Sequence, residues 1–124
     1  MTETQIQSSI IDYLQLLENQ GKLFLHRVNN MGVYDPKRKA YRVFPKGAKK
    51  GFPDIIVIKN GLLIGLEVKT GEGKQSNNQK EVEKKLKKHG AAYYVVRSLE
   101  EVVGIFDKYE FISRHEAIEK FLKG

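Results

Sequence analysis

The sequence contains no cysteine among its 124 residues, which excludes disulfide bonds, thiolate catalysis and cysteine-ligated zinc. No apolar run approaches the roughly 20 residues of a membrane-spanning helix. Residues 1–5 lack the basic and apolar regions of a secretory signal. The chain also shows no internal repeat and no linker, and its length suits one core. We therefore expect a single domain over residues 1–124 and a cytoplasmic location, in a bacterium or a phage-infected host cell.

Positive charge is concentrated in one part of the chain. Residues 1–21 carry a net charge of −3, whereas residues 22–50 carry +8, and the whole chain carries +7. A concentrated basic segment favours a polyanionic partner such as DNA. The candidate nucleic-acid-binding residues are six of the nine cations of this segment, Arg27, Arg38, Lys39, Arg42, Lys46 and Lys49. A solvated loop whose charge only aids solubility remains the alternative.

Residues 54–69 have the pattern of one β-hairpin. Two apolar runs, residues 55–58 and 62–66, flank Asn60-Gly61, which is the strongest short-range signal for a type I′ turn. If these two residues form the loop, Lys59 pairs with Leu62. Asp54 then lies opposite Glu67 at the open end of the hairpin. Both faces of the hairpin are apolar, as expected for strands buried on both sides of a sheet.

Helices and strands alternate around this hairpin. Three- and four-residue apolar steps predict a helix over residues 3–19, with Thr2 and Gln5 as a capping box. A second capping box, Ser76 and Gln79, opens a helix through residue 88. We expect strands near residues 23–29, 40–44 and 91–96, a helix after Ser98 with Val102, Val103 and Phe106 inward, and a last helix over residues 113–122. The order predicts an α/β fold.

The open end of the hairpin has the residues for metal-dependent phosphodiester chemistry. Asp54 and Glu67 supply the hard oxygen ligands that Mg²⁺ or Mn²⁺ prefers, and a strand carbonyl near Val68 offers a third oxygen. Since side chains alternate along a strand, Lys69 shares a face with Glu67, where it can orient water or stabilise the phosphoryl group. A buried Glu–Lys pair beside a turn aspartate, without any metal, is the structural alternative.

Pro53-Asp54 followed by Glu67-Val68-Lys69 resembles the signature of the PD-(D/E)xK nuclease superfamily. The wider pattern resembles its VRR-NUC family, through Glu3, Arg27-Val28-Asn29, Gly51-Phe52-Pro53-Asp54, Glu67-Val68-Lys69-Thr70, Gln79 and Val95-Val96-Arg97-Ser98. This resemblance implies a divalent-metal-dependent deoxyribonuclease with an αβββαβ arrangement, a mixed sheet flanked by helices. It also implies that Asp54 and Glu67 bind metal and that Lys69 is catalytic.

Two further residues gain a role through the resemblance. Glu3 occupies the position from which an acid on the first helix approaches the metal, although an acid in a first helical turn is stabilised by the helix dipole in any case. Gln79 occupies the downstream glutamine position and is expected to act at the site, although its capping box explains it equally well. The three histidines form no ligand set.

The resemblance also suggests the partner and the assembly. Single-domain members resemble Holliday-junction resolvases, so we expect branched DNA as substrate and a symmetric homodimer. The first helix and residues 109–112 are the candidate dimer surfaces, and both fit the core equally well. Two other functions stay open: a catalytically silent DNA-binding module with the same fold, and a phosphohydrolase for small molecules, which would have a compact pocket rather than a broad basic loop.

Overall fold

The computed structural model describes residues 1–28, 34–41, 46–107 and 119 of the chain. The helices and strands, in chain order, are α1 (Glu3–Asn19), β1 (Phe24–Arg27), β2 (Tyr34–Asp35), β3 (Ala40–Tyr41), β4 (Ile55–Lys59), β5 (Leu62–Val68), α2 (Asn77–Lys88), β6 (Ala92–Val96) and α3 (Leu99–Asp107). With β2 and β3 set aside as an insertion, α1 to β6 follow the expected αβββαβ order.

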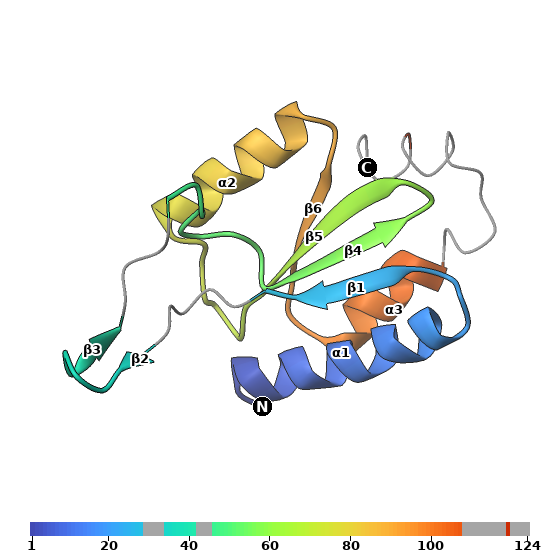
Figure 1. Cartoon of the computed structure of the whole chain (residues 1–124). Helices are drawn as coiled ribbons and strands as arrows, with labels where there is room; N and C mark the ends of the chain where they lie inside the picture. Colours follow the sequence, from blue (N-terminus) through green and yellow to red (C-terminus); the bar gives the residue numbers. More distant parts are fainter. Residues whose placement is uncertain (29–33, 42–45, 108–118, 120–124) are drawn as a thin grey trace.

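A four-stranded mixed sheet forms the centre of the molecule, with the strand order β1-β4-β5-β6. β1, β4 and β5 pair antiparallel, and β5 pairs parallel with β6 after the chain has crossed over through α2. α1 and α3 lie on one face of this sheet and α2 on the other (Figure 1). β2 and β3 pair only with each other and lie apart from the sheet. The expected mixed sheet flanked by helices is confirmed.

The β4–β5 hairpin has the predicted turn and register. Asn60 and Gly61 adopt φ values of 52° and 79°, as a type I′ turn requires, and Lys59 pairs with Leu62. The pairing continues to Ile55 opposite Leu66, which brings the chain on each side to Asp54 and Glu67. The prediction of two buried faces holds for β5 but not for all of β4. There Ile58 is 40% exposed, since α2 packs on β6.

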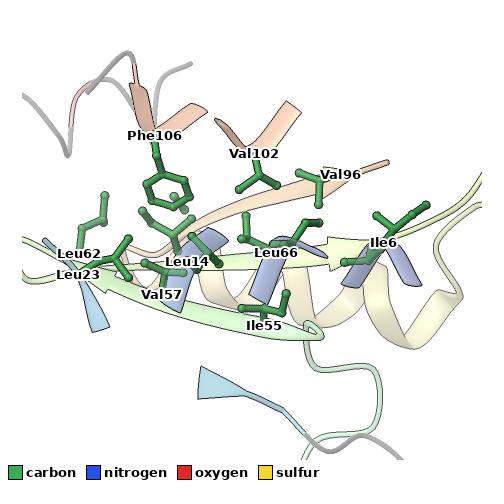
Figure 2. Packing of buried hydrophobic residues seen from close by; sticks show 14 residues of the cluster. Ile6, Leu14, Leu23, Ile55, Val57, Leu62, Leu66, Val96, Val102 and Phe106 are labelled. Atoms are coloured by element: carbon green, nitrogen blue, oxygen red, sulfur yellow. The ribbon is translucent and has the colours of Figure 1, made fainter. Parts of the chain in front are cut away.

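The hydrophobic core lies between the sheet and the two helices α1 and α3 (Figure 2). α1 contributes Ile6, Ile10 and Leu14, whose spacing matches the predicted amphipathic pattern. α3 contributes Val102 and Phe106, whereas Val103 is only half-buried, in contrast to the expectation that it points inward. The core thus packs against one face of the sheet, and α2 lies on the other face.

Several expectations lie outside the described residues. These are Arg42, residues 42–44 of the expected short strand, residues 109–112 as dimer surface and, apart from Glu119, the helix expected over residues 113–122. Within the described part of the chain, no helix is long and apolar enough to cross a membrane.

Candidate metal and phosphodiester site

Asp54 sits at the entrance to β4, and the backbone around it is anchored on both sides. Its carboxylate Oδ2 accepts a hydrogen bond from the backbone N–H of Val68 at 2.8 Å. Its backbone carbonyl accepts from the N–H of Val28, also at 2.8 Å. Asp54 is thus tied to the residue after Glu67 and to the end of β1. The hairpin register therefore brings Asp54 to the end of β5, as the sequence predicted.

Glu67 is the most unusual residue of the site. Its side chain is 1% exposed, and its Oε1 atom has no hydrogen-bond partner among the described residues. Burial, followed by the negative charge of Asp54, raises the pKa of Glu67 to about 8. An ionised carboxylate held in this way is unfavourable unless a positive charge joins it. The geometry therefore fits a cation between Glu67 and Asp54.

Lys69 lies on the same side of β5 as Glu67, as the strand alternation predicted. Its Nζ atom is 3.8 Å from Glu67 Oε2, and its backbone N–H donates to the carbonyl of Val96 in β6. Lys69 acts to lower the pKa of Glu67, but this effect is smaller than those of burial and Asp54. One ammonium at this distance therefore leaves the acidic pair only partly compensated.

Gln79 joins the start of α2 to the site. Its Oε1 accepts from the backbone N–H of Ser76 at 2.9 Å, which completes the predicted capping box. Its Nε2 donates to Glu67 Oε2 at 3.0 Å. Gln79 therefore caps α2 through its amide oxygen and contacts Glu67 through its amide nitrogen, so the cap does not prevent the contact with the site.

Two glycines allow the backbone segments around Asp54 to approach closely. A Cβ atom on Gly65 would lie 2.8 Å from Pro53 Cγ, and one on Gly51 would lie 2.7 Å from the carbonyl carbon of Asn78. Gly51 also has a φ of +87°, which favours glycine. Sequence reasoning used these residues only as part of a motif. The signal for their packing role was a glycine two residues before Pro53-Asp54 and another inside a buried strand.

The other two predicted metal ligands are placed differently. Val68 is fully buried in β5, beside both acids. Glu3 is exposed in the first turn of α1, and its charge makes the smallest contribution to the raised pKa of Glu67. No group of three or more acidic or histidine side chains suited to a metal ion occurs in the described residues. The structure thus pairs Asp54 with Glu67 and leaves Glu3 at the periphery.

The predicted nucleic-acid-binding residues are spread over three regions. Arg27 ends β1 and pairs with Ile55, the neighbour of Asp54. Arg38 and Lys39 lie in the turn between β2 and β3, away from the sheet (Figure 1). Lys46 and Lys49 are exposed in the loop that leads to Asp54. Among the described cations of this set, Lys46 and Lys49 are close to Asp54 in the sequence, and Arg27 is close to it through strand pairing.

The fold resembles that of a solved structure described as a "VRR_NUC domain". The similarity covers 88% of this chain and 99% of that chain, with a TM-score of 0.61 and 20% sequence identity. The sequence matches no protein-family model and no curated protein sequence. The chain therefore has a VRR-NUC fold, in agreement with the sequence resemblance.

Proposed function

We propose that this protein is a nuclease that hydrolyses phosphodiester bonds of DNA with Mg²⁺ or Mn²⁺. The observation that carries the proposal is the Glu67 carboxylate, which is buried beside a second carboxylate and has one oxygen without a partner among the described residues. A protein that had only to fold would gain by replacing Glu67 with a neutral residue. The VRR-NUC fold supports the same reading.

Asp54 and Glu67 would hold the metal, with the Val68 carbonyl and Glu3 as the further ligands suggested by the sequence. These are hard oxygen donors, which suit Mg²⁺ and Mn²⁺. When bound, the ion neutralises charge on the phosphate and lowers the pKa of an attacking water. Gln79 holds Glu67 in position through its amide N–H. Lys69 brings an ammonium to the same space, where it can orient water or stabilise the phosphoryl oxygens.

A plasmid-nicking assay tests the proposal. Wild-type protein should nick DNA in Mg²⁺ or Mn²⁺, and should be weak or inactive in Ca²⁺, whose larger and looser coordination misplaces the water. Lys69→Ala should lose cleavage and keep the fold. DNA binding without cleavage in every metal would instead identify a catalytically silent DNA-binding module. Hydrolysis of small phosphodiesters without DNA cleavage would identify a phosphohydrolase.

We also propose that the basic loop before Asp54 holds the DNA backbone. Neutralising Lys46 and Lys49 should flatten the dependence of log affinity on log salt, by about 0.9 for each phosphate of duplex DNA that the loop no longer neutralises. Neutralising Lys84 and Lys88, exposed on α2, removes the same charge and should leave the slope nearly unchanged. Equal slopes for wild type and the loop variant would show that Lys46 and Lys49 are only solvated charges and do not contact the DNA backbone.

Finally, we propose that the protein prefers branched DNA and acts as a symmetric homodimer. One chain offers one Asp54–Glu67–Lys69 site, and symmetric incision of a four-way junction requires two sites related by a two-fold axis. Light scattering measures the assembly, and a cleavage panel of duplex, flap and four-way-junction DNA measures the preference. A monomer that cuts linear duplex as readily as a junction would contradict this part of the proposal.

A further inference from the structure

A groove of about 420 Å³ separates the loop that precedes Asp54 from α2. This volume lies within the range of pockets that bind small organic groups. Its apolar lining comes from both sides and includes Phe52, Val82 and Leu86. Its cationic lining also comes from both sides and includes Lys49, Lys50 and Lys85. Among the described residues of the lining, Glu81 is the only acid. The groove thus combines an apolar surface that includes an aromatic ring with a net positive rim.

The groove is physically connected to the acidic pair. Gly51 packs directly against the backbone of Asn78 and Gln79, which pins the loop to the first turn of α2. Gln79 in turn donates to Glu67. Asn78 also lines the groove, so the groove begins beside the residue that positions Glu67. A group bound in the groove would therefore lie next to DNA engaged at Asp54 and Glu67.

We propose that this groove binds an unpaired nucleobase of the DNA substrate, an inference that rests on the proposed nuclease function. A nucleotide combines a flat, largely apolar base with a negative phosphate, which matches Phe52 and the apolar lining next to three lysines. A base inside duplex DNA is stacked on both faces, so it cannot enter. Stacking on an aromatic side chain tolerates any base, so the groove would select unpaired DNA rather than a sequence.

The test measures affinity in Ca²⁺ for three duplexes: one fully paired, one with a single unpaired thymidine and one with an abasic site in place of that thymidine. Wild-type protein should bind the thymidine duplex about 10-fold or more tightly than the abasic duplex, as expected for one stacked base. Equal affinity for these two DNAs would overturn the proposal, because they share the same phosphates and the same unpaired sugar and differ in the base. This comparison needs no variant.

Variants then assign the effect to the groove. Phe52→Ala should abolish the difference between thymidine and abasic DNA and retain the affinity for paired duplex. Phe24→Ala removes the same ring from an exposed position outside the groove and should keep the difference. Lys85→Gln should weaken binding to both unpaired DNAs, whereas Lys84→Gln, on a residue outside the groove lining, should not. A Phe52→Ala protein that stays folded in a thermal melt and keeps the difference would contradict the assignment.

The outcomes for the groove and for the nuclease are separable. Nicking of plasmid DNA in Mg²⁺ together with equal affinity for thymidine and abasic DNA would overturn the groove proposal and leave the nuclease in place. Absence of any DNA binding would overturn both.

Discussion

Helices α1 and α2 begin with the same capping motif, but the two motifs have different surroundings. In α1, Thr2 Oγ1 accepts from the N–H of Gln5, and Gln5 Oε1 accepts from the N–H of Thr2. In α2, Ser76 and Gln79 exchange the same two bonds. Gln5 is exposed, whereas Gln79 is half-buried and its amide nitrogen also donates to Glu67. A local motif can therefore fix a side chain that the tertiary structure then uses at a site.

The largest expected effect concerns the acids beside these two helix starts, Glu67 at α2 and Glu3 in α1. Glu67→Gln and Asp54→Asn should each lower the DNA cleavage rate about 10³-fold or more, since each removes a charged metal ligand. Glu3→Gln should cost on the order of 10-fold, since Glu3 is exposed at the periphery of the site. Single-turnover cleavage measures all three. Full activity in Asp54→Asn would contradict the site assignment.

The next effect is on stability and depends on pH. The pKa of Glu67 is about 8 in the folded protein against 4.5 for the free group, so the folded state binds more protons than the unfolded state between these values. The free energy of unfolding of the metal-free protein should therefore fall as the pH rises from 4.5 to about 8. We expect a loss of a few kcal/mol, at about 1.4 kcal/mol per unit of pKa difference. Urea unfolding at several pH values measures it.

Two variants control this pH experiment. Glu67→Gln should remove most of the dependence and be more stable than wild type at pH 8. Glu3→Gln should retain the dependence, because the charge of Glu3 is a minor cause of the raised pKa. Added Mg²⁺ should stabilise wild type at pH 8 more than it stabilises Glu67→Gln, since the ion compensates the ionised pair. Wild-type stability that does not change between pH 5 and 8 would contradict the buried acidic pair.

The two capping glutamines provide the direct test of the comparison. Gln79→Ala should lower cleavage by roughly 10- to 100-fold, as expected when a partner that orients a metal ligand is removed. Gln5→Ala loses the equivalent cap bond and should cleave DNA at the wild-type rate. Metal affinity, measured by calorimetry, should weaken only in Gln79→Ala. Equal cleavage rates for the two variants would show that Gln79 only caps α2 and does not support the site.

The smallest effect separates capping from the site. Thr2→Ala and Ser76→Ala should each reduce the free energy of unfolding by about 1 kcal/mol, because each removes one N-cap hydrogen bond. Thr2→Ala should leave cleavage unchanged. Ser76→Ala should reduce it less than Gln79→Ala does, since the amide that reaches Glu67 remains. Thermal melts and the nicking assay measure the two quantities on the same samples.

The hairpin is the part of the site that sequence reasoning predicted best. Asn60-Gly61 fixed the turn, the turn fixed the register, and the register brought Asp54 to the end of β5 near Glu67. Each step depends on residues next to each other in the chain. The position of Glu3 shows the limit of this reasoning. Its distance from Glu67 depends on how α1 packs across the sheet, and neither the motif nor the helix pattern gives that distance.

The sequence by itself determined the elements whose signals are local: two capping boxes, a type I′ turn, the alternation that puts Lys69 beside Glu67 and the basic loop before Asp54. Only the tertiary structure decided that Glu67 is buried, with one oxygen unpartnered within the described part of the chain. It also decided that Gln79 reaches Glu67 across 12 residues of sequence, and that the loop and α2 enclose a groove. These properties depend on distances between elements, which follow from the packing of the sheet against α1, α2 and α3. Burial of one carboxylate beside another is therefore a property of the assembled fold.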